Sequence, residues 1–224
     1  MAVAINNWSR RLPDGSHSFA SDTEALIGPN AILQLKAPVN EILGEGVMAQ
    51  MLDLCRVPMP TGDRMISEQV VGRVHHTLWQ LFPDRAQAVS ERAGLATADY
   101  IRKNRIPRVV RIALRMMPAH MAERMLTKAI ENHAWTFCGS GALRTNREDG
   151  SIHFLLRDNP LADVDAHPQH PCHWHSAVFE RLFTSVLGKP YYCQEVSCCA
   201  MGGDTCHFVM SRNATHPHFK GLKL

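Results

Sequence analysis

Apolar residues recur at helical spacing between residues 27 and 133 and follow a strand-like pattern over much of what comes after. Four segments show the helical spacing, in which apolar side chains return every three or four residues: 27–55, 67–82, 84–104 and 107–133. We expect breaks at Pro38, at Gly44–Gly46 and at Pro118. Residues 134–160 then predict short strands, 176–188 an amphipathic helix, and 191–211 a hairpin around a Met-Gly-Gly-Asp turn. Helices followed by strands predict an α+β fold with an antiparallel sheet, a helix packed on it and a C-terminal hairpin.

The same pattern predicts a single domain between two less ordered ends. Residues 1–27 are polar at their start and are expected to form a flexible arm, and 213–224 are expected to form a disordered tail. The domain would span 28–212, with a helical part at 28–132 and a sheet part at 133–212.

Composition excludes several classes of protein. The chain contains no run of 18 apolar residues and no apolar signal region near its N-terminus, so we expect a cytoplasmic protein with reduced thiols. A formal net charge of +3, without a recognisable reader motif, argues against nucleic acid as a partner.

Four of the seven cysteines lie within Cys193–Cys206, beside Glu195. Cys198 and Cys206 would face each other across the hairpin. Glu195 could join them only if the strand bulges near Ser197, because residues three apart in a regular strand point to opposite faces. Cys172 would begin the preceding helix and could come back to the hairpin. Three thiolates and one carboxylate fit a closed tetrahedral zinc site.

Other roles for these cysteines remain open, because the spacing is not that of a standard zinc finger. Cys193 and Cys199 are expected to be small buried hydrophobic residues, and either could replace one of the ligands. A disulfide and a catalytic thiol are the remaining alternatives, although no Cys–His–acid arrangement is evident in the sequence.

The run of Cys172, Glu195, Cys198, Gly-Gly-Asp and Cys206-His-Phe resembles the vinyl-4-reductase domain family, most strongly over 130–212. Family members are small-molecule-binding domains, and the sensor members hold zinc with a Cys, Glu, Cys, Cys set of this spacing. The resemblance therefore implies structural Zn²⁺ on Cys172, Glu195, Cys198 and Cys206. The segments 65–83 and 134–141 resemble the branch of the family that serves bacteriochlorophyll synthesis in purple bacteria.

The family label implies reduction of a vinyl group on a divinyl chlorophyllide precursor, but no redox-cofactor motif accompanies it. The closest string, Gly139–Arg144, lacks the third glycine of a dinucleotide site and is expected to be a turn. We therefore expect a carrier or accessory protein that binds a magnesium tetrapyrrole of the Mg-protoporphyrin or divinyl protochlorophyllide type. A 4-vinyl reductase with an external reductant is the alternative. Expected partners are the magnesium chelatase or the methyltransferase of the pathway and a second copy of the chain.

A magnesium tetrapyrrole needs a flat apolar slot and an axial ligand. Histidines are frequent, with 13 in the chain, and His75, His76, His120 and His133 are the candidates in the helical part. His76 and Trp79 share a helix face. The methionines at 116, 117, 121 and 125 are spaced to line one face, as core or as a pocket wall.

Six basic residues and no acidic ones lie between Arg102 and Arg115. Arg108, Arg111 and Arg115 recur at helical spacing, which is typical of a solvated face. Arg111 and Arg115 could instead contact the carboxylate of a pigment, anionic lipid or a partner enzyme, which predicts contact with the periphery of the inner membrane.

Overall fold

The computed structural model describes residues 25–162 and 170–219, so residues 1–24 of the arm predicted at 1–27 and the chain end at 220–224 lie outside the described residues. Leu26 and Ile27, the last residues of that arm, form strand β1, which pairs with β2 in a two-stranded sheet. Short helices follow β1. The elements are β1 (Leu26–Ile27), α1 (Asn30–Leu33), α2 (Lys36–Leu43), α3 (Val47–Leu54), β2 (Ile66–Ser67) and α4 (Glu68–Leu81). The expected break at Pro38 is wrong, because this proline lies in the first turn of α2, where a backbone N–H has no helical partner anyway.

The long helix α5 (Pro83–Asn104) begins and ends as its sequence predicts. Pro83 occupies the first turn, Asp84 follows it, and Arg102 and Lys103 lie in the last turn, which complements the helix dipole. Its buried face is built from small residues, among them Ala86, Ala93 and Gly94, so another helix can approach closely.

The next helices are α6 (Arg108–Met116), α7 (Ala119–Asn132) and α8 (Trp135–Cys138). The separation at Pro118 is confirmed. Residues 135–138 were expected to start a strand, but they form a helical turn in which the Cys138 N–H donates to the Ala134 carbonyl. The expected core position of the methionines is also wrong for Met116, Met121 and Met125, which are exposed.

The second half of the chain forms the predicted antiparallel sheet, in the order β3-β4-β6-β5. Its strands are β3 (Ala142–Glu148), β4 (Ser151–Arg157), β5 (Tyr192–Ser197) and β6 (Cys206–Ser211), with a 3₁₀ turn at Cys199–Met201 between the last two. Asp149 and Gly150 have positive φ values of 48° and 76°, which suits the two-residue turn between β3 and β4. Beyond β6, residues expected in a disordered tail form a 3₁₀ turn at Pro217–Phe219.

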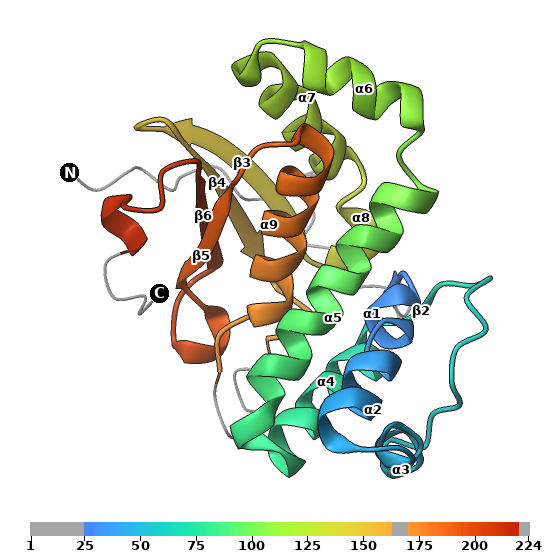
Figure 1. Ribbon diagram of the computed structural model, residues 1–224. Coiled ribbons are helices and arrows are strands. Elements are labelled where there is room, and N and C mark those ends of the chain that lie inside the picture. The colour runs from blue at the N-terminus through green and yellow to red at the C-terminus, as the bar shows by residue number, and fades with distance from the viewer. Residues whose placement is uncertain (1–24, 163–169, 220–224) are drawn as a thin grey trace, which may run out of the picture.

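Helix α9 (His173–Leu187) lies across one face of this sheet (Figure 1). Helix α5 packs against α9 on the side of α9 that faces away from the sheet. Phe179 and Phe183 on α9 meet Phe154 and Phe208 on the sheet, and the rings of Phe154 and Phe179 stack at 4.5 Å. All four side chains are buried, so this aromatic layer is the core of the sheet half.

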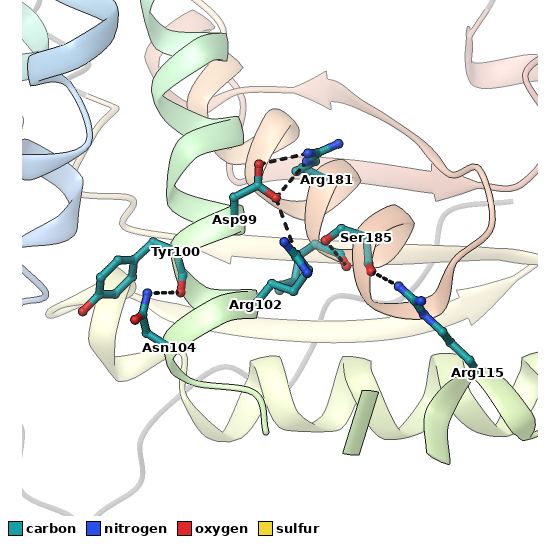
Figure 2. Close-up of polar contacts among 8 residues, drawn as sticks. Asp99, Tyr100, Arg102, Asn104, Arg115, Arg181 and Ser185 are labelled. Carbon is teal, nitrogen blue, oxygen red and sulfur yellow. Dashed lines mark hydrogen bonds and ion pairs between the residues drawn. The ribbon is translucent and has the colours of Figure 1, made fainter. Parts of the chain in front are cut away.

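The contact between α5 and α9 is close because Gly94 has no side chain. A Cβ at this position would lie 2.5 Å from the carbonyl oxygen of Trp174 and 2.8 Å from the Cβ of Ala177. Further along the same contact, Arg181 donates to Asp99, as Figure 2 shows. Gly94 therefore fixes where the first turn of α9 lies.

Two arginines connect further elements of the fold to one another. Arg115 on α6 donates to the carbonyl of Ser185 at the C-terminal end of α9, as Figure 2 shows. It also donates to the carbonyl of Val186. Arg147 on β3 pairs with the buried carboxylate of Glu123 on α7, which also accepts a hydrogen bond from Tyr191. No helix among residues 25–162 and 170–219 has the length and apolar character needed to cross a bilayer.

Candidate functional site

The four residues implied as zinc ligands come together at the start of α9. One ligand atom from each of Cys172, Glu195, Cys198 and Cys206 lies within 4.8 Å of the others. The three sulfurs are separated by 3.6, 3.7 and 3.7 Å. A tetrahedral ion with metal–sulfur bonds near 2.3 Å places its sulfurs about 3.8 Å apart. The cluster can therefore hold a metal ion without rearrangement of its sulfurs.

Local backbone geometry brings these side chains to one point. The register of β5 against β6 shifts between Glu195 and Ser197, and this irregularity is the predicted bulge. It lets Glu195 and Cys198 turn to the same side. Cys172 immediately precedes the first residue of α9, and its backbone N–H donates to the Glu195 carboxylate.

A polar side chain outside the ligand set contacts two of the sulfurs. The Asn159 amide donates to Cys172 Sγ at 3.2 Å and to Cys206 Sγ at 3.4 Å. The backbone N–H of Cys199 also donates to Cys206 Sγ, at 3.5 Å. Donors of this kind stabilise thiolates and orient them toward a cation.

The protonation of the cluster also fits a cation site. Burial, followed by the nearby Cys206, raises the pKa of Glu195 to about 8. Hydrogen bonds from the thiols of Cys172 and Cys206 lower the pKa of Cys198, so negative charge is favoured on that sulfur. Several acidic groups compete for one buried volume, and a divalent cation would stabilise all of their anionic forms together.

The other cysteines near the hairpin lie outside the ligand set. Cys193 and Cys199 are both half-buried, and burial raises the pKa of each thiol, that of Cys199 to about 12. All seven cysteines are free thiols.

A separate apolar cavity of about 600 Å³ lies between β1, α1, the C-terminal half of α5, α7 and α9. Its volume is within the range of roughly 300–1,000 Å³ that small-molecule sites occupy. Aliphatic and aromatic side chains make most of the wall, including Ile101, Leu126, Ile130, Phe137, Val178 and Phe179. Arg105, Tyr100 and the exposed ring of Trp135 provide polar and aromatic groups at the same cavity.

The structure places one of the six predicted pocket residues, His133, in the wall of this cavity. On α4, Trp79 instead stacks on His170 at 4.0 Å, and His76 follows His75 on the same helix. His120 lines a shallow depression next to Asp149 and His216. Arg111 and Arg115 lie on α6, and Arg115 is engaged with the end of α9.

Two residues that the sequence reasoning did not select also line the cavity, Trp174 and His175. Both lie in the first turn of α9 and are buried. A signal was present in the sequence, because His175 continues the apolar face that Val178, Phe179 and Leu182 form one and two turns later.

Comparison with known proteins bears directly on this site. The family model of the vinyl-4-reductase domain matches residues 152–212, which contain all four cluster residues. The "Bacteriochlorophyll synthase 23 kDa chain" of Rhodobacter capsulatus is 38% identical over 210 residues, covering 93% of this chain and 94% of that protein. The protein of the same name from Cereibacter sphaeroides is 38% identical over 185 residues, covering 82% and 89%.

The chain belongs to the family of bacteriochlorophyll synthase 23 kDa chains. The resemblance to the vinyl-4-reductase domain family, and within it to the proteins of purple bacteria, is thereby confirmed. Among solved structures, an H-NOX protein from S. oneidensis in the Fe(II)NO ligation state has a TM-score of 0.50 at 12% identity, covering 83% of this chain and 98% of that chain. At this identity the likeness between the 23 kDa family and H-NOX proteins concerns the fold alone.

Proposed function

We propose that this member of the family serves bacteriochlorophyll biosynthesis by binding a magnesium tetrapyrrole of the Mg-protoporphyrin or divinyl protochlorophyllide type. The observation that carries the proposal is the apolar cavity of about 600 Å³ enclosed by α5, α7 and α9. Its aliphatic and aromatic wall suits the faces of a macrocycle, and Arg105 offers a charge partner for a carboxylate of the pigment.

The bound pigment would be carried between pathway enzymes, so the magnesium chelatase and the methyltransferase are the proposed partners. The sequence offers no nicotinamide or flavin motif beside the cavity, which favours a carrier or accessory factor over a reductase. Anaerobic incubation with divinyl protochlorophyllide and either NADPH or reduced ferredoxin distinguishes the two. Formation of a monovinyl product would show that the protein is a reductase and would refute the carrier role.

Titration with Mg-protoporphyrin tests the binding itself. We expect a saturable shift of the Soret band and quenching of the fluorescence of Trp135, which lies at the cavity. Ala129 is an exposed residue of α7 that also lines the cavity, so the side chain of Ala129→Trp would fill part of it. This variant should bind the pigment at least about tenfold more weakly. Met125→Trp, one turn earlier and outside the cavity wall, is the matched control. A linear, unsaturable titration of the unmodified protein would refute the proposal.

We also propose that the ion at the cysteine cluster is zinc with a structural role. Three sulfurs at tetrahedral spacing and a carboxylate suit zinc, and four protein ligands leave no open position for chemistry. Metal analysis should find about one zinc per chain. Cys206→Ala should lose this zinc and lower the melting temperature, whereas Cys193→Ala should keep it. Equal zinc content in the two variants would contradict the assignment.

Contact with an anionic membrane surface is proposed for α6. Val109, Ile112 and Met116 recur at one face of this helix and are 72%, 49% and 83% exposed. The exposed Lys103 and Arg108 nearby suit anionic headgroups, so both the charge and the exposed apolar area favour an anionic membrane surface.

Sedimentation with vesicles tests this contact. Binding should require anionic lipid, and Ile112→Glu should reduce it, whereas Leu54→Glu on α3, which also replaces an exposed apolar residue, should not. Equal binding of both variants would exclude α6 as the contact. A homodimer also stays a prediction, which light scattering with and without pigment would test.

A further inference from the structure

The first turn of α9 places an imidazole with unpaired nitrogens at the wall of the apolar cavity. His175 is 1% exposed and lines this cavity. Neither its Nδ1 nor its Nε2 has a hydrogen-bond partner among the described residues. Buried polar groups are nearly always paired in folded proteins, so an unpaired imidazole inside a cavity indicates a ligand that completes it.

The surroundings of His175 are aromatic. The rings of Phe137, Phe179 and Phe208 lie with their centroids 6.2, 6.2 and 5.8 Å from the His175 ring. Burial lowers the pKa of His175 to about 3, so the imidazole is neutral at physiological pH and has a free lone pair. A neutral imidazole is a common metal ligand in proteins.

Neighbouring histidines show that this arrangement is particular to His175. His75, which is equally buried, has its Nε2 bonded to the Ala31 carbonyl at 2.9 Å. His133, the other histidine that lines the cavity, is exposed and has its Nδ1 bonded to the Ala129 carbonyl at 2.8 Å. Of the two histidines in the cavity wall, His175 is therefore the one in which neither ring nitrogen has a hydrogen-bond partner among the described residues.

We propose that His175 is the axial ligand of the magnesium in the bound tetrapyrrole. This inference rests on the proposed function, because it names the group that holds the metal of the pigment. Four ring nitrogens occupy the plane of magnesium, and the imidazole donates its lone pair from one face. The neighbouring Trp174 has a buried indole N–H without a partner among the described residues and is available to a carbonyl or carboxylate oxygen of the same ligand.

The assignment fixes the orientation of the pigment. Gly94 holds α5 against the backbone of Trp174, so the first turn of α9 cannot retreat from the cavity toward α5. One face of the macrocycle would lie against α9, and its periphery would reach toward Arg105, Tyr100 and Trp135.

The test compares Mg-protoporphyrin with metal-free protoporphyrin, which has no metal to accept an axial ligand. The unmodified protein should bind the magnesium form at least about tenfold more tightly and give the magnetic circular dichroism of a metal ligated by nitrogen. His175→Leu should bind both pigments with similar affinity and lose the nitrogen-ligated spectrum. His133→Leu should keep both properties. Zinc content and far-ultraviolet circular dichroism report whether each variant is folded.

Rescue separates ligation from a structural role of the side chain. In His175→Gly, millimolar imidazole should restore the nitrogen-ligated spectrum, since the free base can enter the vacated volume. If the unmodified protein binds neither pigment, the proposed function fails. If it binds both pigments equally and His175→Leu leaves the spectrum of the magnesium form unchanged, the pocket stands and the axial assignment is refuted.

Discussion

Replacing Gly94 by alanine reverses the usual effect of that substitution in a helix. In an exposed helix interior, glycine to alanine stabilises by about 1 kcal/mol. Here the new Cβ would lie 2.5 Å from the carbonyl oxygen of Trp174, and ordinary contact begins at 3.4 Å. Helix α9 would have to move by about 0.9 Å, and neither the backbone carbonyl nor the adjacent Ala177 can rotate away. Overpacking of this kind costs about 1–3 kcal/mol.

We expect Gly94→Ala to lower the free energy of unfolding by about 2 kcal/mol, which corresponds to a fall in melting temperature of about 4–8 °C for a chain of this size. Differential scanning calorimetry of the zinc-loaded protein measures the change in melting temperature. Leu95→Ala, at the next and more exposed position of α5, should change stability by no more than about 0.5 kcal/mol. Because the displaced carbonyl belongs to Trp174, affinity for Mg-protoporphyrin should fall in Gly94→Ala as well. An unchanged or raised melting temperature would refute the close helix contact.

Three further predictions concern the cluster, the buried histidines and the ion pairs. Asn159→Leu removes two hydrogen bonds to sulfur and should weaken zinc binding about 10–100-fold in a competition with a chromogenic chelator. Burial lowers the pKa values of His75 and His175 in the folded state to about 4 and about 3. Between these values and pH 6.5, only the unfolded chain binds a proton at each of the two histidines. Stability should therefore fall as pH falls below 6.5, by about 2 kcal/mol per histidine at pH 5, and His175→Leu should flatten the urea-unfolding profile against pH. Arg147→Ala removes the cation beside the buried Glu123 carboxylate, which keeps its hydrogen bond from Tyr191, and should cost about 1–3 kcal/mol. Arg181→Ala, in an exposed pair, should cost no more than about 1 kcal/mol in the same assay.

The cluster of cysteines and Glu195 could be anticipated from the sequence because its geometry is mostly local. Cys198 and Cys206 are joined by a short hairpin, and the need for a bulge near Ser197 follows from the alternation of side chains along a strand. Only the approach of Cys172 required a tertiary contact. The family resemblance supplied it, and the structure places its sulfur within 3.7 Å of the other two.

The pocket could not be derived in the same way, because its walls come from segments far apart in the chain. His76 and Trp79 have a plausible helical spacing, yet α4 turns this face toward His170 instead of the cavity. Helical periodicity identifies the buried face of an element, but the close approach at Gly94 decides which element it meets. The sequence reasoning therefore did not select His175, which reaches the cavity wall through the packing of α9.

The order of residues at the start of α9 makes the two sites interdependent. Cys172 belongs to the proposed metal site, and three positions later His175 lines the cavity, so the start of one helix contributes to both. If zinc and pigment both order this turn, binding of one raises the affinity for the other, and thermodynamic reciprocity requires the two affinities to change by the same factor. On the proposed function, loss of zinc would then weaken binding of the tetrapyrrole, and bound tetrapyrrole would slow the release of zinc.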